Sequence, residues 1–131
     1  RFGNYYLKKK YPKRFKLHIG SSNKVLSQLI IKKNIYDLIF IDGSHDYLDV
    51  VGDLKDSNKL SNEKTLIILD DVYMPNENEE RSYFDGHNTG PTKAWKEFVS
   101  AEIIKHDGYI EFLTENTNKR SLSYGRYIKF I

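Results

Sequence analysis

No cysteine occurs among the 131 residues, which excludes disulfides, thiolate metal ligands and a cysteine nucleophile. No apolar run approaches the roughly 18 residues that a membrane-spanning helix needs. The sequence also shows no internal repeat, low-complexity tract or signal peptide. A chain of this length forms one domain at most. We therefore expect a single soluble domain, 1–131, in a reducing compartment such as the cytoplasm.

Neither sign of charge dominates, since the formal net charge is +3, but the charges are unevenly placed. Residues 5–16, YYLKKKYPKRFK, contain six Lys or Arg, whereas residues 76–80, NENEE, are acidic. Such a basic run can contact nucleic acid or a phosphate group. A solvated helix face is the simpler interpretation, because nothing else typical of a nucleic-acid-binding module accompanies it. We expect neither nucleic acid nor a membrane as a partner.

Apolar patterning predicts alternating strands and helices, which is the α/β class. Short apolar runs predict strands at 15–20, 36–42 and 65–71, and the last two have the continuous character of parallel strands. Helical spacing of apolar residues predicts a helix after each of these strands. Ser22 or Asn23 marks the start of the first helix, and Ser44 or Asp46 marks the start of the second. Pro91 fits the first turn of the third helix, which is predicted over 92–105. The segments 108–115 and 121–131 predict an antiparallel hairpin.

A long polar stretch at 73–91 has neither strand nor helix periodicity. Loops of this length in a compact domain tend to be functional or mobile. We expect a lid, in which four side chains would help to select a ligand, with an ordinary solvated loop as the simpler alternative. These side chains are Tyr73, Tyr83, Phe84 and His87.

Three carboxylates stand where two predicted parallel strands end. Asp42 ends one strand, and Asp70 and Asp71 end the other. Ligands bind at the carboxyl ends of strands in open parallel sheets, and neighbouring strands lie roughly 4.8 Å apart. Clustered carboxylates need a compensating cation or proton, and oxygen ligands favour a hard ion such as Mg²⁺, Ca²⁺ or Mn²⁺. His45 lies beside this predicted site; capping roles for each acid, and a surface position for His45, are the alternatives.

The segments YDLIFIDGSHDYLDVVGDL, LIILDDV and GPTKAWKEF resemble the class I S-adenosylmethionine-dependent methyltransferases. The similarity points to their metal-dependent O-methyltransferase branch, which includes sugar-modifying macrolide enzymes and cephalosporin-hydroxylase-like proteins. It implies a Rossmann-like sheet, mostly parallel, with a carboxyl-terminal antiparallel hairpin. It also implies S-adenosylmethionine and Mg²⁺ or another divalent cation as cofactors, with a hydroxyl of a small molecule such as a sugar as the acceptor.

By this resemblance, Asp42, Asp70 and Asp71 would be the metal ligands, and His45 would be the general base. The HIGSS segment would contact the adenine end of the cofactor, although Ser21 stands where the family usually has an acid. The resemblance therefore assigns cofactor contacts to five residues. These are Gly20, Ser21, Ser22, Asp42 and Gly43.

The resemblance also implies an absence. Nothing in residues 1–14, RFGNYYLKKKYPKR, matches the family's glycine-rich loop or its ribose-binding acid. We expect an incomplete domain without the first two strands, the carboxyl-terminal part of a methyltransferase, inactive by itself and completed by a missing segment or by oligomerisation. Two rival functions are a non-catalytic methyltransferase-like partner module and a Mg²⁺-dependent phosphoryl-transfer or hydrolase domain. The absence of a phosphate-binding glycine loop and of a nucleophile signature argues against the second.

Overall fold

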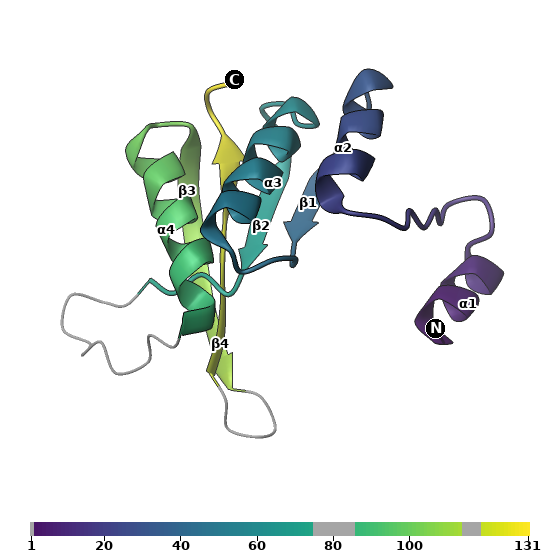
Figure 1. The fold of residues 1–131 in the computed structure, drawn as a ribbon, viewed down its shortest axis with the longest axis horizontal. Coiled ribbons are helices and arrows are strands. Elements are labelled where there is room, and N and C mark those ends of the chain that lie inside the picture. The colour runs from purple at the N-terminus through teal and green to yellow at the C-terminus, as the bar shows by residue number, and fades with distance from the viewer. Residues whose placement is uncertain (1, 75–85, 114–118) are drawn as a thin grey trace.

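The structure is a computed structural model that describes residues 2–74, 86–113 and 119–131. A four-stranded sheet in the order β1-β2-β4-β3 forms its centre (Figure 1). The strands are β1 Leu38–Ile41, β2 Leu66–Asp70, β3 Ile104–Leu113 and β4 Lys119–Tyr127. β1 and β2 are parallel, whereas β4 runs antiparallel to both β2 and β3. The α/β class and the carboxyl-terminal hairpin are thus confirmed, and the parallel part of the described sheet is the β1–β2 pair.

Four helices accompany the sheet: α1 Phe2–Lys10, α2 Ser22–Ile31, α3 Tyr47–Lys59 and α4 Gly86–Ser100. α3 and α4 lie along one face of the sheet, α2 packs beside α3, and α1 stands away from the sheet (Figure 1). α3 begins at an N-cap, since the Asp46 carboxylate accepts a hydrogen bond of 2.9 Å from the Leu48 N–H. Val50 and Leu54 then follow at helical spacing and are buried.

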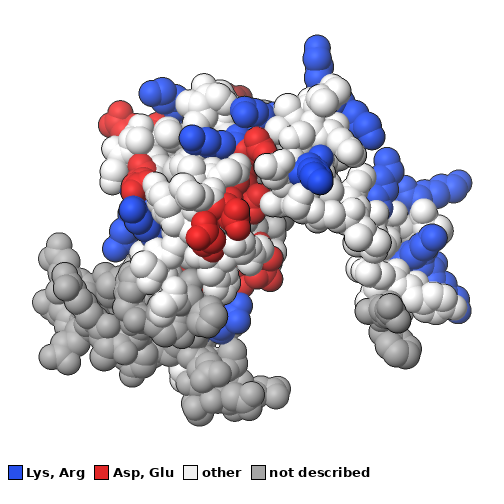
Figure 2. All heavy atoms as spheres, viewed as in Figure 1, with Lys and Arg blue, Asp and Glu red and all other residues white. Residues whose placement is uncertain are grey.

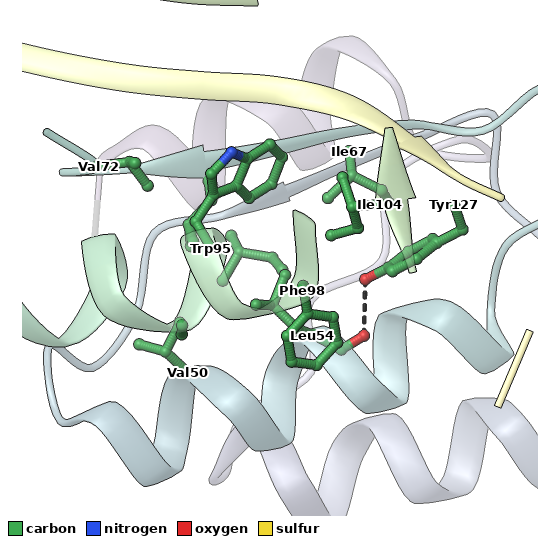
Figure 3. Close-up of a cluster of buried hydrophobic side chains, with 11 residues drawn as sticks. Val50, Leu54, Ile67, Val72, Trp95, Phe98, Ile104 and Tyr127 are labelled. Carbon is green, nitrogen blue, oxygen red and sulfur yellow. Dashed lines mark hydrogen bonds between the residues drawn. The ribbon is translucent and has the colours of Figure 1, made fainter. Parts of the chain in front are cut away.

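The core lies between the sheet and helices α3 and α4 (Figure 3). Val50, Leu54, Ile67 and Trp95 are each at most 1% exposed. Tyr127 is also buried, and its hydroxyl donates a 2.6 Å hydrogen bond to the Leu54 carbonyl oxygen (Figure 3). This bond ties the last residue of β4 to α3.

Trp95 connects α4 to β3 through a polar contact at the margin of the core. Its indole N–H donates a hydrogen bond of 3.1 Å to Nδ1 of His106. The two rings meet edge to face, with their centroids 6.0 Å apart. The bond gives the buried indole nitrogen a partner, which a buried donor requires.

The strand expected at 15–20 is wrong, because these residues form coil. Leu17 is 52% exposed and Ile19 is 90% exposed. A strand is stabilised by a hydrogen-bonded neighbour, and among the described residues β1 pairs with β2 alone. Residues 15–20 therefore have no neighbouring strand with which to pair in the described sheet.

The helix expected over 92–105 is shifted, because α4 already begins at Gly86 and ends at Ser100. Pro91 lies inside α4 rather than in its first turn, and it is fully buried. β3 then starts at Ile104, after a turn in which Glu102 has a φ of +54°. The apolar side chains of 103 and 104 thus continue the core from the turn and the strand, not from the helix.

The expected lid falls mostly outside the described residues, which exclude 75–85 and therefore Tyr83 and Phe84. Of its remainder, Tyr73 is buried at 3% exposure. The Tyr73 N–H donates a 2.8 Å bond to the Thr92 hydroxyl of α4. His87 lies in the first turn of α4. The beginning of this stretch is therefore bonded to α4, and its end forms the first turns of that helix.

The sheet face opposite α3 and α4 carries apolar side chains that are partly or largely exposed. Phe40, Ile68 and Tyr124 share one row across the sheet, because residues paired in register point to the same face. Phe40 is 50% exposed, and Leu38, in the same strand, is 54% exposed.

Within the described residues, none of the helices is long and apolar enough to cross a bilayer.

The Tyr127 bond yields a stability prediction. We expect Tyr127→Phe to lower the free energy of unfolding by about 1 kcal/mol, because it removes a buried hydrogen bond without changing the apolar contacts. Urea denaturation measures this difference. Tyr124→Phe is the matched control, since Tyr124 is only partly buried in the same strand. Equal losses in the two variants would contradict a special role for the bond to Leu54.

Candidate active site at the carboxyl ends of β1 and β2

The parallel pairing of β1 and β2 brings the strand-end acids to the same edge of the sheet. Ile41 pairs with Leu69, so Asp42 and Asp70 follow on neighbouring strands. Asp71 comes next, with a φ of +55° and an exposure of 6%. Aspartate is among the few residues that tolerate this left-handed conformation. The turn directs the chain away from the sheet and buries the Asp71 carboxylate.

His45 joins this edge from the loop between β1 and α3. Its Nε2 lies 3.1 Å from Oδ2 of Asp71. The loop is fixed on both sides, since the Ser44 hydroxyl accepts a bond from the Asp46 N–H, and Asp46 caps α3. A Cβ added at Gly90 of α4 would lie 2.1 Å from the His45 carbonyl oxygen. Only glycine allows α4 to approach the His45 backbone this closely.

Arg120 of β4 provides a positive charge at the same place. Its Nη2 lies 2.9 Å from Oδ2 of Asp70, and its Nε lies 3.2 Å from Oδ1 of Asp71. Asp71 therefore lies between an imidazole and a guanidinium. This arrangement fixes the orientation of the carboxylate, because each of its oxygens has a charged or polar partner.

Burial is the main cause that raises the pKa of Asp71, and the neighbouring Asp70 charge raises it further. Arg120 and His45 oppose this increase, while the Asp42 charge adds to it with the smallest effect. The same carboxylates raise the pKa of Arg120, first through its hydrogen bond to Asp70. All five side chains thus belong to one electrostatic cluster.

The expected metal ligand set of Asp42, Asp70 and Asp71 is not assembled in this conformation. Among residues 2–74, 86–113 and 119–131, no group of three or more His, Cys, Asp or Glu side chains is arranged to hold a metal ion. The Arg120 guanidinium instead bonds to both Asp70 and Asp71. The repulsion between the acids, from which the sequence predicted a divalent ion, is here opposed by a side chain of the protein.

The residues predicted to contact a cofactor are linked through Asp53 of α3. The Ser22 hydroxyl, at the start of α2, is near enough to the Asp53 carboxylate to lower the pKa of that carboxyl, against the larger effect of burial. On the other side, a Cβ added at Gly43 would lie 3.5 Å from Oδ2 of Asp53. Gly20 and Ser21 immediately precede Ser22, and Gly20 has a φ of +152°. The two predicted segments, 20–22 and 42–43, therefore meet at one buried carboxylate.

A family model described as "Methyltransferase domain" matches residues 1–72, more than half of the chain. The chain belongs to this methyltransferase-domain family. The matched segment contains Asp42, His45, Asp53 and both acids at the end of β2, whereas Arg120 lies beyond it.

Solved structures share the fold of this methyltransferase domain. A protein from Klebsiella pneumoniae described as an O-methyltransferase candidate superposes with a TM-score of 0.69 at 19% identity, over 90% of this chain and 51% of its own. An O-methyltransferase from Bacillus cereus in complex with SAH superposes with a TM-score of 0.63 at 19% identity, over 85% of this chain and 50% of its own. The domain thus spans about half the length of these proteins. Comparison with proteins of curated function gives no match.

Three residues of the methyltransferase domain that matter at the site were not singled out from the sequence. Arg120 falls between the two segments predicted to form the hairpin, 108–115 and 121–131, although in the structure it lies in β4, on the same face as Leu122 and Tyr124. Asp53 could have been noticed in the sequence, because it places an acid on the helix face that carries the buried Val50 and Leu54. Gly90 could not have been noticed, since its close approach to residue 45 depends on tertiary packing.

Asp53 yields a prediction on pH. Burial raises its pKa above the usual 3.8, so the ionised form costs stability at neutral pH. Asp53→Asn should therefore unfold at a higher temperature than wild type near neutral pH. As the pH falls through the raised pKa, the wild-type carboxyl takes up a proton and this advantage should disappear. Thermal unfolding followed at several pH values measures it, with Asp37→Asn on the exposed surface as the control; parallel pH curves for wild type and Asp53→Asn would contradict the assignment.

Arg120 yields a prediction on the cluster. Its guanidinium lowers the pKa of Asp71, so Arg120→Ala should raise that pKa further. Carboxyl-carbon NMR titration measures the change. Arg126→Ala is the matched control, since Arg126 lies on the same face of β4 but pairs with Asp107. An unchanged Asp71 titration in Arg120→Ala would show that the contact is absent in solution.

Proposed function

We propose that this methyltransferase domain forms part of an S-adenosylmethionine-dependent O-methyltransferase in which His45 is the general base. Membership of the family supports the reaction class. The contact between His45 Nε2 and Asp71 Oδ2 is the observation that carries the residue assignment. A histidine oriented by a buried carboxylate is a common arrangement for proton transfer.

The tautomer follows from this contact. When the Nε2 hydrogen points to Asp71, the lone pair of the neutral imidazole lies on Nδ1. Nδ1 is then the atom that would accept the proton of an acceptor hydroxyl. The Asp71 charge stabilises the imidazolium that forms, and Arg120 keeps Asp71 in place from the opposite side.

When bound, S-adenosylmethionine supplies a methyl group on a positively charged sulfur, which an oxygen nucleophile can attack. We propose that Gly20, Ser21, Ser22, Asp42 and Gly43 contact this cofactor. Their convergence on Asp53 supports the proposal, because both segments border one carboxylate. Their role is to bind and to align the donor with the acceptor, which lowers the entropic part of the barrier.

We further propose that another segment completes the donor site. Within the described sheet, β1 has a neighbour on one side only, and its Leu38 and Phe40 side chains are half exposed. The chain also spans about half the length of the solved structures that share its fold. An added strand would pair with the open edge of β1 and could bring further cofactor contacts.

The acceptor in this proposal is a hydroxyl of a small molecule, with a sugar as the expected class. Mg²⁺ or another divalent ion would have to displace Arg120 from Asp70 and Asp71 before these carboxylates could bind it. The described donor set therefore does not fit a metal as it stands. In this proposal the proton of the acceptor hydroxyl passes to His45 alone.

Substitution of His45 tests the base. In a preparation that releases S-adenosylhomocysteine from S-adenosylmethionine, His45→Ala should lower kcat by about 10²- to 10⁴-fold, the usual contribution of a general base. The pH profile of wild-type activity should contain the acidic limb that a general base produces. His45→Ala should lose this limb.

The exposed Glu63→Gln variant is the control and should keep wild-type activity. An unchanged acidic limb in the His45→Ala profile would remove His45 from the base role. If no S-adenosylhomocysteine forms with any hydroxyl acceptor and no S-adenosylmethionine binding is measured by calorimetry, the non-catalytic partner module becomes the better interpretation.

A further inference from the structure

Charge is divided between two parts of the chain. Residues 1–36 contain ten Lys or Arg and no Asp or Glu, whereas residues 37–131 contain eleven Lys or Arg and eighteen Asp or Glu. Lys and Arg side chains gather around α1 and the coil that follows it, at the right of Figure 2, and the carboxylates lie over the rest of the molecule. The modest net charge of the whole chain therefore conceals a strongly basic segment.

Part of this basic segment forms a groove. Its volume is about 520 Å³, and it is lined by residues from three stretches of chain. The coil after α1 contributes Lys13, Arg14 and Lys16 together with His18, and the end of α2 contributes Lys32. Among the described residues that line the groove there is no carboxylate. Four cations without a countercharge attract an anion with several charges.

The groove is separate from the candidate active site. Asn34, Ile35 and Tyr36 line it and lead into the amino end of β1. Asp42 and His45 follow the carboxyl end of the same strand. The basic groove and the acidic cluster thus lie at opposite ends of β1.

Aromatic side chains accompany these cations. Tyr5 is 70% exposed and Tyr6 is 57% exposed on α1. Lys10 lies over the Tyr6 ring at 5.3 Å, and Arg14 lies over the Tyr11 ring at 5.2 Å. Cations interleaved with exposed aromatic rings are typical of surfaces that bind the backbone and the bases of single strands.

We propose that residues 2–36 bind single-stranded nucleic acid, with phosphates in the groove and bases against the exposed tyrosines. The sequence alone did not favour nucleic acid as a partner, because no other feature of a nucleic-acid-binding module accompanies the basic run. The structure adds a concave site assembled from separate segments, which a flat bilayer cannot enter. The positive charge also continues from the groove to Lys8, Lys9 and Lys10, farther than one small anion would need.

Binding of a fluorescently labelled oligouridine to the 131-residue chain, followed by anisotropy, tests the proposal. If the four groove cations each contact one phosphate, affinity should fall roughly 50-fold between about 50 mM and about 200 mM salt. For Lys13→Gln combined with Lys16→Gln, the same change in salt should lower affinity only about 7-fold. The double variant should also bind more weakly than wild type at the lower salt concentration.

Lys64→Gln combined with Lys96→Gln is the matched control, because it removes the same charge from the acidic part of the chain. This control should bind like wild type, and thermal unfolding should be equal in all three proteins. Equal binding by the groove and control variants, or no binding at low salt, would overturn the proposal. Binding of a free uridine nucleotide as tightly as the strand, or of anionic vesicles but not of the strand, would overturn it as well. The test involves neither S-adenosylmethionine nor His45, so its outcome is independent of the proposed methyl transfer.

Discussion

The parallel pairing of β1 with β2 is the constraint on which the candidate site depends. Two parallel neighbours end at the same edge of a sheet, and this brings Asp42 beside Asp70. The left-handed conformation of Asp71 then turns its carboxylate into the protein, toward His45. Val50, Leu54 and Trp95 of helices α3 and α4 share one buried cluster with Ile41 of β1 and with Ile67 and Leu69 of β2. The core and the site are therefore consequences of one strand pairing.

The second determinant is the route of β4. Because β4 inserts between β2 and β3, Arg120 lies beside the end of β2, although the two are 50 residues apart in sequence. A guanidinium that bonds two adjacent carboxylates offsets their repulsion. The buried Asp71 can then orient His45 while its charge is balanced within the protein. Arg120 belongs to the hairpin, so the hairpin contributes to the site as well as to the sheet.

Much of the fold could be predicted from the sequence, because local patterns determine it. The apolar runs that became β1 and β2, the Asp46 cap and the final hairpin all follow from periodicity and capping chemistry. The strand at 15–20 failed because strand formation needs a neighbour that local sequence does not reveal. The start of α4 was missed because Pro91 is usually a boundary residue, yet here it is packed inside the helix.

The site was predictable only in part. The acids and His45 could be proposed from the sequence because the acids end predicted strands and His45 lies three residues after one, whereas Arg120, Asp53 and Gly90 act through contacts between distant elements. Trp95 also acts through a contact between distant elements, because its indole nitrogen is hydrogen-bonded to His106. It is the only tryptophan of the chain. Its fluorescence therefore comes from one location, where α4 meets β3, and the bond exists only while Nδ1 of His106 carries no proton. The protein thus contains an intrinsic optical reporter of whether this helix is seated on the hairpin.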